Sequence, residues 1–307
     1  MINKQESVLI IILNWNGISD TMECLRSIKE QDYKDIDILV IDNGSRENPE
    51  REIKKLDSHI IFVRNEENTG FAAGYNQGIE WAKTKDYDYL FLVNNDTVLA
   101  SDCISKLVVR EKQHKDKAVI TPSILYYSHD GKNSIIWSEG AKINLLTGRT
   151  EHINHMMQYV FKDEVMTVDY IVGCALFLPN AAATNPFFNT EYFAFYEDVD
   201  CSFSLKKKGY ELLVDKSTYI HHKVSATAGY LSRFSIYLQA RNKLLFMKKN
   251  RTALEYMAFL FVLILFEQFY WIVFFLLKKR ADLVLISYRG LFDGIKGISG
   301  KPIGTFS

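Results

Sequence analysis

Apolar runs alternate with amphipathic segments over the first hundred residues. Four runs rich in β-branched and aromatic residues are predicted strands: Val8–Leu13, Ile36–Ile41, Ile60–Val63 and Tyr89–Val93. Helical spacing separates them, since Met22, Leu25 and Ile28 recur every three residues and a second helix begins near Ala72. Strands that alternate with helices predict βαβ units, and strands that are apolar throughout predict a parallel sheet covered on both faces. The predicted fold class is therefore α/β.

After residue 100 the pattern is less regular. Strand-like pieces at Ala118–Ile120 and Val168–Phe177 are separated by polar loops, and helical spacing returns over Ser232–Lys249. We interpret this stretch as a continuation of the same domain and not as a separate unit.

The run Ala253–Leu277 contains three strongly polar residues, Glu255, Glu267 and Gln268, and as a helix it is long enough to cross a bilayer core of about 30 Å. A spanning helix would bury Glu267 and Gln268 near its middle, at a cost of a few kcal/mol. A hairpin or interfacial element and a helical dimer interface are the alternatives. Basic residues at both ends suit two ends on one anionic cytoplasmic surface, so we favour membrane association without a full crossing. They are Lys248, Lys249, Arg251, Lys278, Lys279 and Arg280.

Composition narrows the class of partner. The 307 residues are 48% hydrophobic, and 37 basic residues balance 37 acidic ones. This balance argues against nucleic-acid binding, which usually shows as a basic excess. The N-terminal apolar run is too short for a signal peptide, so we expect a cytoplasmic protein. The cysteine spacing indicates neither a zinc site nor disulfides, and we expect reduced, mostly buried thiols at Cys24, Cys103, Cys174 and Cys201.

Small polar residues, acids and glycines follow each predicted strand. Ligands of parallel sheets bind at the carboxyl ends of the strands, which is where these segments lie. One such loop is ordinary turn chemistry, but four at one sheet edge predict a site for a polar ligand. The segments are Asn14–Gly17, Asp42–Ser45, Asn65 with Asn68–Asn76, and Asn94–Thr97.

Two of these loops point to a phosphate and a metal. Gly70 and Gly74 permit close backbone approach, and the helix that begins there offers free N–H groups to an anion, although a structural turn explains the glycines equally well. Asp96 follows a buried strand, where a carboxylate is a natural ligand for a divalent cation that bridges a diphosphate. An N-cap for the next helix is the alternative role for Asp96, and the residues alone leave the two equal.

Taken together, the motifs resemble those of family-two glycosyltransferases in the rhamnosyltransferase-like branch. The matching runs are Val8–Gly17, Asp42–Ser45, Asn68–Asn76, Asn94–Thr97, Gly173–Leu178, Phe195–Asp200, His222–Ser225 and Arg241-Asn242. The resemblance covers roughly residues 7–250. It implies a GT-A domain over 1–250, with a nucleotide-binding half over about 1–100 and an acceptor half over about 101–250, followed by a hydrophobic helical tail over 251–307.

The resemblance also implies donor-binding residues, position by position. Asp42 would hydrogen-bond the base of a UDP- or dTDP-sugar, the backbone near Asn14 would line the same pocket, and Gly70–Asn76 would pass beside the ribose and diphosphate. The implied donor set is Asn14, Asp42, Asn43, Ser45, Asn68, Gly70, Phe71, Gly74, Asn76 and Asn95.

A divalent cofactor, Mn²⁺ or Mg²⁺, is implied by the same resemblance. Asp96 matches the last acid of the family's DxD-type motif, which ligates the metal at the diphosphate. The first position of that motif is Asn94, so this chain has one carboxylate fewer than the family pattern. His222 matches a histidine that completes the coordination in some relatives. A structural role is the alternative for a lone histidine, and the adjacent His221 is the alternative ligand.

Glu197 and Asp198 match the family's acidic pair, in which the aspartate is the general base. Inverting transfer is one in-line displacement, so it needs a base for the acceptor hydroxyl on one side of the sugar and a Lewis acid for the leaving diphosphate on the other. A charged helix start is the structural alternative for these acids. The aromatic run Tyr192–Tyr196, like Trp15 and Trp137, is open to two roles, stacking on a sugar ring and core packing.

The sequence therefore predicts an inverting glycosyltransferase that acts on a glycan or polyprenyl-linked acceptor in surface polysaccharide synthesis, at the inner face of the cell membrane. A sugar-1-phosphate nucleotidyltransferase is the enzymatic alternative, but here no basic residue follows the first strand until Arg26. A non-catalytic sugar-nucleotide-binding scaffold is a further alternative, and assembly into a homo-oligomer stays open.

Overall fold

The computed structural model describes residues 5–129, 133–224, 231–302 and 304. Its strands are β1 (Val8–Asn14), β2 (Ile36–Asp42), β3 (Ile61–Arg64), β4 (Tyr89–Asn94), β5 (Thr97–Leu99), β6 (Ala118–Tyr126), β7 (Ile136–Ser138), β8 (Ala141–Ile143), β9 (Thr150–His152), β10 (Val165–Thr167), β11 (Ala175–Pro179) and β12 (Glu211–His222). Its α-helices are α1 (Ile18–Lys29), α2 (Glu50–Leu56), α3 (Phe71–Ala82), α4 (Cys103–Gln113), α5 (Glu197–Lys207), α6 (Arg233–Asn250), α7 (Ala253–Val262), α8 (Gln268–Leu277) and α9 (Ala281–Lys296). Short 3₁₀ turns span Asn180–Ala182 and Thr190–Tyr192, and a π-helical turn, Leu263–Glu267, joins α7 to α8.

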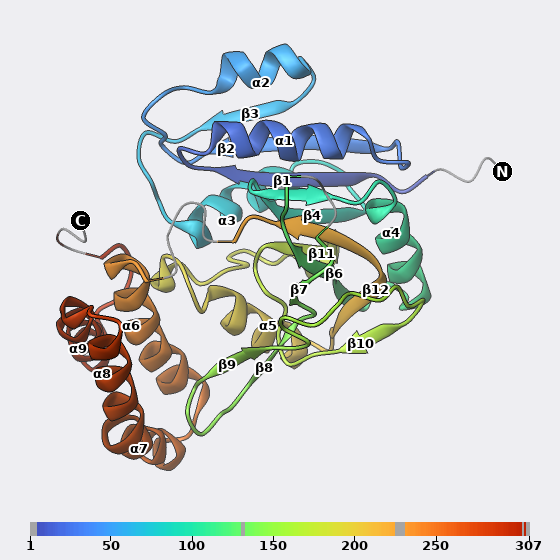
Figure 1. The fold of residues 1–307 in the computed structure, drawn as a ribbon. Coiled ribbons are helices and arrows are strands. Elements are labelled where there is room, and N and C mark those ends of the chain that lie inside the picture. Colours follow the sequence, from blue (N-terminus) through green and yellow to red (C-terminus); the bar gives the residue numbers. More distant parts are fainter. Residues whose placement is uncertain (1–4, 130–132, 225–230, 303, 305–307) are drawn as a thin grey trace.

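One mixed sheet organises the chain, in the order β10-β12-β6-β11-β4-β1-β2-β3 (Figure 1). β1 is parallel to β2 and β4, β2 is parallel to β3, and β12 is parallel to β6. β11 is antiparallel to both of its neighbours, β4 and β6, and the short β5 pairs antiparallel with β12. The α/β class is confirmed, as a mostly parallel sheet flanked by helices.

The strand β1 illustrates how the sheet is covered. Val8, Ile10 and Ile12 belong to the core that includes residues of α1, α2 and α4, whereas Leu9 and Ile11 belong to the core that includes residues of α3 and α5. Successive side chains of a strand point to opposite faces, so a continuous apolar run serves both cores at once.

The four predicted strands of the first hundred residues are all present, and the third begins at Ile61. The pairing aligns their carboxyl ends, because Asn14 lies opposite Asp42, Asp42 opposite Arg64, and Leu13 opposite Asn94. Polar residues that are far apart in the sequence therefore come together along one sheet edge.

The predicted strand Val168–Phe177 is wrong over its first seven residues, since β11 begins at Ala175. In the loop before it, Val168 and Tyr170 bond to the backbone of β12 and β8, but nearer to β11 side chains are the partners of the backbone. The N–H of Ile171 donates to Ser202 Oγ at 3.2 Å, and the N–H of Gly173 donates to Asp198 Oδ2 at 3.0 Å. An apolar run alone does not distinguish a buried loop of this kind from a buried strand.

Residues Ala253–Leu277 form a continuous helix through the π-helical turn. Among the described residues, this is the one helix whose length and apolar composition would allow it to cross a membrane. Two of its three polar residues, Glu267 and Gln268, are buried against the domain. Glu267 is 4% exposed, forms an ion pair with Lys243 of α6, and lies 3.4 Å from Arg149 Nε. Trp271 Nε1 also donates to Glu267, at 3.1 Å.

The other sides of this helix, and part of α9, expose large apolar side chains. They include Leu254, Met257, Phe261, Phe266, Phe269 and Leu277, with Leu285 and Phe292 on α9. α9 itself packs closely against α6, because Gly290 and Gly294 meet the α6 backbone: an added Cβ would lie 2.5 Å from Tyr237 O and 2.8 Å from Arg241 O. The tail therefore adheres to the domain and turns an apolar surface outward.

Gly70 marks the point where α3 touches a segment more than 120 positions later in the sequence. Its φ is +92°, and a Cβ at this position would lie 2.6 Å from the carbonyl oxygen of Phe193. Both the backbone conformation and the space therefore favour glycine.

We expect Gly70→Ala to destabilise the protein more than Gly209→Ala. Gly209 has a similar φ of +86°, but an added Cβ would meet nothing within 4 Å, so its substitution tests backbone strain alone. Strain costs roughly 1 kcal/mol at each site, and the collision at Gly70 should add about 1–3 kcal/mol. Urea unfolding of the two variants measures the difference, and equal losses would contradict the close contact with Phe193.

Candidate active site

A buried carboxylate anchors the ends of the first three strands. Asp42 is fully buried and accepts a hydrogen bond from Asn14 Nδ2 at 2.7 Å and another from the Ser45 hydroxyl. Arg64 Nε lies 3.5 Å from Asp42 Oδ2, and Arg64 Nη2 donates to Ser45 O at 2.9 Å. Asp42 therefore lies beneath the surface of the site, while Arg64 and the neighbouring Trp15, which is 40% exposed, lie at the surface.

A second network centred on Asn43 fixes the loop before α3. The Asn43 amide nitrogen donates to Asn68 Oδ1 at 3.2 Å and to Gly70 O at 3.1 Å. Its oxygen accepts from the N–H and the hydroxyl of Thr69 and from Asn65 Nδ2. One side chain thus connects the end of β2 to the glycine loop, and buried polar groups in such networks need every partner.

Three residues of the implied donor set, Asn95, Asn76 and Gly74, make their contacts with other groups of the protein. Asn95 Nδ2 donates to Thr21 Oγ1 at 3.0 Å and to Gly17 O at 3.2 Å. Asn76 accepts from the N–H of Phe188 and donates to its carbonyl oxygen. A Cβ at Gly74 would lie 2.5 Å from Leu13, so this glycine lets α3 pack on β1. Direct donor contacts by these residues stay predictions.

The beginning of α3 differs from the expectation of free N–H groups. The N–H of Phe71 donates to Phe193 O at 2.8 Å, that of Ala72 lies 3.4 Å from the same oxygen, and that of Gly70 donates to Asn68 Oδ1. These groups are engaged by the protein because the Phe193 carbonyl takes the place that an anion would otherwise occupy. The Phe71 ring packs against Tyr75 and Phe188.

Strand pairing brings Asp96 and His222 together across 126 positions of sequence. Asp96 lies in the turn between β4 and β5, and His222, at the end of β12, is paired with Thr97. Asp96 Oδ1 is 3.2 Å from His222 Nε2, whereas His221 Nδ1 lies 3.2 Å from Tyr126 O. Burial raises the pKa of Asp96, but the contact with His222 outweighs it and holds that pKa below its ordinary value.

Asp96 and His222 together offer one carboxylate and one imidazole to a divalent cation. Within the described residues no group of three or more acidic, histidine or cysteine side chains is placed to hold a metal ion. Asp96 Oδ1 and His222 Nδ1 are nevertheless buried and lack a well-aligned hydrogen-bond partner there. Asn94 Oδ1 accepts from Tyr75 OH at 3.2 Å, which draws it away from such a role. Ser225, at the end of the His222–Ser225 motif, lies outside the described residues.

Asp198 occupies the first turn of α5 and is partly exposed, while Glu197 beside it is buried. The Asp198 carboxylate accepts a hydrogen bond from the N–H of Gly173 at 3.0 Å and another from that of Val199 at 2.8 Å. Burial raises the pKa of Asp198, and these two backbone bonds oppose the rise. Asp200 instead joins α5 to the end of α6, where Lys249 lies 2.6 Å away.

The Asp96–His222 pair and the Asp198 carboxylate are the two acidic centres, and they lie on either side of the junction between β4 and β11. β4 and β11 are paired, with Val93 opposite Ala175, and the N–H of Asn94 donates to Cys174 O at 2.9 Å. Burial raises the pKa of the Cys174 thiol, and both Asp96 and Asp198 contribute to the rise. The turn that carries Asp96 and the backbone that holds Asp198 therefore lie side by side.

Two residues of the site, Arg64 and Lys223, were given no role in the sequence analysis. Arg64 ends the third strand, and its position alone could have indicated it. Lys223 follows His222, and its ammonium lies 2.7 Å from Glu23 Oε2 and also contacts Asp20. Trp137, which the sequence analysis left open between sugar stacking and core packing, lies edge-to-face with His222 at a centroid distance of 4.7 Å. No sequence motif marks contacts of this kind, which depend on the pairing of β12.

The aromatic run before α5 is mainly core. Tyr192, Phe193 and Tyr196 are each at most 8% exposed, and Tyr196 OH donates to Gly148 O at 2.8 Å. The structure therefore favours the packing role over sugar stacking for these three residues.

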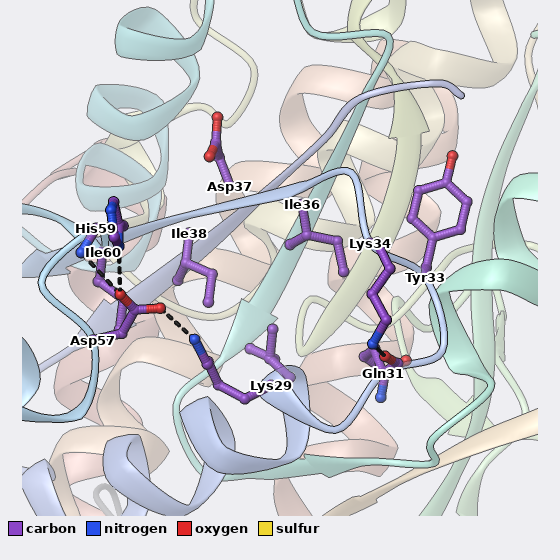
Figure 2. A pocket seen from close by; sticks show the side chains of 11 residues that line it. Lys29, Gln31, Tyr33, Lys34, Ile36, Asp37, Ile38, Asp57, His59 and Ile60 are labelled. Atoms are coloured by element: carbon purple, nitrogen blue, oxygen red, sulfur yellow. Dashed lines mark hydrogen bonds and ion pairs between the residues drawn. The ribbon is translucent and has the colours of Figure 1, made fainter. Parts of the chain in front are cut away.

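A cavity of about 190 Å³ lies elsewhere, where β2 begins (Figure 2). Its lining includes Lys29, Asp57 and His59, and Lys29 and His59 both contact Asp57 (Figure 2). It is at the amino end of the strand, opposite the row of polar residues described above, and its ionic groups neutralise one another.

Solved structures share this fold at low sequence identity. The mannosyltransferase PcManGT from Pyrobaculum calidifontis, in complex with GDP-Man and Mn²⁺, matches 99% of this chain and 77% of its own with a TM-score of 0.57 and 13% identity. S. aureus TarS in complex with UDP-GlcNAc matches 95% of this chain and 81% of its own with a TM-score of 0.57 and 16% identity. The architecture is the GT-A fold.

Curated relatives match over part of the chain. Glycosyltransferase GlyG of Streptococcus pneumoniae is 28% identical over 128 residues, which cover 41% of this chain and 40% of GlyG. Poly-beta-1,6-N-acetyl-D-glucosamine synthase of Staphylococcus aureus is 28% identical over 123 residues, which cover 39% of this chain and 29% of the synthase. The matched region thus spans less than half the length of either relative.

The family model for glycosyl transferase family 2 matches residues 7–180, more than half of the chain. This stretch contains the strand-end networks, the Asp96 turn and the backbone that holds Asp198. The match favours glycosyl transfer over nucleotidyl transfer. The chain belongs to glycosyl transferase family 2.

Proposed function

We propose that this protein is an inverting glycosyltransferase that moves a sugar from a UDP- or dTDP-sugar to a hydroxyl of a glycan or polyprenyl-linked acceptor. The proposal rests on the adjacency of the Asp96–His222 pair and the Asp198 carboxylate at the junction of β4 and β11. A single displacement needs one group at the leaving diphosphate and another at the attacking hydroxyl. Two acidic centres on a rigid sheet suit that division of roles.

We assign base recognition to the ends of β1, β2 and β3. Asp42 and Asn14 lie underneath and orient Ser45 and Arg64, while Trp15 offers an exposed ring for stacking. The loop fixed by Asn43, including Asn68 and Gly70, would continue this surface toward the ribose and diphosphate. The rhamnosyltransferase-like motif pattern adds dTDP-rhamnose to the UDP-hexoses among donors to test.

Asp96 and His222 are the residues that would hold Mn²⁺ or Mg²⁺. When bound, the metal supplies Lewis-acid stabilisation to the leaving diphosphate. A site with few protein ligands suits a cation that takes its remaining ligands from donor phosphates and water. The bound Mn²⁺ of the mannosyltransferase structure supports a divalent cation in this fold by analogy, without identifying its ligands here.

Asp198 would accept the proton of the acceptor hydroxyl while that oxygen attacks the anomeric carbon and the bond to the diphosphate breaks. The N–H groups of Gly173 and Val199 fix the direction of its carboxylate. Burial raises its pKa and so increases its affinity for that proton. Glu197 is buried behind it, where a positioning role suits it better than contact with the acceptor.

We further propose that the tail rests on the inner face of the cell membrane without crossing it. Glu267 is engaged by Lys243 and Arg149 of the domain, so a crossing helix would carry α6 and the β8–β9 hairpin into the hydrocarbon. The apolar surface of this helix and α9, flanked by basic residues, has the character of an interfacial element. A polyprenyl-linked acceptor would be presented at that surface.

Asp198→Asn should lower the rate of transfer by about 100- to 10,000-fold and leave donor affinity within about twofold, because the amide keeps the shape but cannot take a proton. The readout is release of UDP or dTDP from the sugar donor in the presence of a polyprenyl-diphosphate-linked monosaccharide, with calorimetry for donor binding. Asp200→Asn on the same helix is the matched control and should stay active. The wild-type rate should fall as the pH falls through the raised pKa of Asp198, since protonation removes the base. Near-normal turnover of Asp198→Asn would remove the residue from this role.

The membrane proposal predicts flotation of the wild-type protein with phosphatidylglycerol vesicles. The double variant Phe266→Glu/Phe269→Glu places two charges on the exposed face of the tail and should lose at least about 90% of this binding. Val109→Glu changes an exposed apolar residue of α4 and should bind as wild type does. A stable dimer in sedimentation that the double variant breaks, with no vesicle binding by the wild type, would favour the dimer interface instead.

A further inference from the structure

The segment Tyr192–Tyr196, here called the elbow, contacts the beginning of α3 and leads directly into α5. Three of its five residues, Phe193, Phe195 and Tyr196, have φ values of +65°, +66° and +72°. For residues with a β-carbon this region is unfavourable by about 1–3 kcal/mol each. A bulky aromatic residue there is rarer still, so surrounding contacts must impose this conformation.

Two adjacent residues of α6 supply those contacts. Asn242 Nδ2 lies 2.9 Å from Tyr192 O, 2.8 Å from Ala194 O and 2.8 Å from Phe195 O. The amide of this fully buried side chain is thus shared by three carbonyl groups of the elbow. Without it those carbonyls would be left buried with fewer partners, which is costly.

Arg241 supports Asn242 and extends the cluster. Its Nε donates to Asn242 Oδ1 at 2.9 Å, which fixes the orientation of the amide, and its Nη2 donates to Tyr192 O at 3.1 Å. Its Nη1 donates to Gly300 O at 2.8 Å, and the N–H of Gly300 in turn donates to Glu191 O. The guanidinium is fully buried, so its hydrogen bonds are made inside the protein.

The elbow reaches both halves of the proposed site. At one end, Phe193 O accepts the N–H of Phe71 and crowds Gly70 in the donor loop. At the other end, Tyr196 precedes Glu197 and Asp198 directly. The two halves also meet at Gly173, where an added Cβ would lie 3.3 Å from both Asp198 Cβ and the Phe71 ring. The shape of the elbow therefore sets where the carboxylate stands relative to the donor loop.

We infer that Asn242, oriented by Arg241, is a positioning residue that holds the elbow in its strained form and so aligns Asp198 with the donor. Among the described residues the side-chain hydrogen bonds of Asn242 go to Arg241 and the elbow and not to the donor set or Asp198, so it acts through the backbone of the elbow. This inference rests on the proposed role of Asp198 as the base. It predicts an effect on turnover that is larger than the effect on donor binding, because a small displacement of a catalytic group can cost about 100-fold in rate.

The test compares Asn242→Ala with Asn250→Ala, the same substitution at the end of the same helix. Asn250 Nδ2 donates to Asp200 Oδ1 and Phe246 O, and among the described residues no hydrogen bond joins it to the elbow, so it controls for loss of a half-buried amide on α6. The assay is release of UDP or dTDP with the polyprenyl-diphosphate-linked monosaccharide, and nucleotide affinity is measured by calorimetry. We expect kcat to fall by about 10- to 100-fold in Asn242→Ala, with nucleotide affinity within about threefold, and to fall less than threefold in Asn250→Ala.

Two further variants keep the test decisive. Asn242→Asp keeps the shape but removes the donors and should lose as much activity as Asn242→Ala. Asn242→Ser retains one hydrogen-bond donor and replaces Asn242→Ala in the comparison if that variant does not fold. We then expect its kcat to lie between the values of Asn242→Asp and the wild type. Equal kcat in Asn242→Ala and Asn250→Ala, with Asp198→Asn inactive, would overturn this inference alone. An active Asp198→Asn would overturn the proposed base and the inference with it.

Discussion

The pairing of β4 with β11 is the constraint on which the site depends. It places the turn that carries Asp96 beside the backbone that holds Asp198, although the two acids are 102 positions apart in the sequence. The pairing of β5 with β12 adds His222 to the same place. Sheet pairing fixes positions to a fraction of an ångström, whereas loops alone would not, and catalytic groups need that rigidity.

Much of this arrangement was predictable from the sequence. The apolar runs of β1 to β4 located the strands, and the polar residues after them located the site edge, because parallel strands end together. What the sequence could not indicate was the direction of each side chain. Asp42, Asn76 and Asn95 are predicted donor residues, and their partners in the structure are protein groups. The N–H groups at the beginning of α3 are engaged by Phe193, a contact between positions too distant for any local pattern.

The tail shows the same division between pattern and contact. The sequence predicted its length and apolar character over Ala253–Leu277. The inward direction of Glu267 depends instead on Lys243 and Arg149, which lie in other parts of the fold. α9 then returns along α6, and Gly300 bonds the elbow through Glu191 and Arg241. The tail, the elbow and α6 are thus connected by buried hydrogen bonds, so the apolar surface of the tail and the proposed base share one support.

The most direct measurement of the central claim is calorimetric titration of the protein with UDP and with dTDP, each in Mn²⁺ and in EDTA, for the wild type and for Asp96→Ala. The account predicts that one nucleotide binds in Mn²⁺, that EDTA weakens this binding, and that Asp96→Ala in Mn²⁺ resembles the wild type in EDTA. Affinity that is the same with Mn²⁺ and with EDTA, or the same for both proteins, would contradict a metal held by Asp96. Failure of both nucleotides to bind would contradict the assignment of the strand ends to a nucleotide-sugar donor.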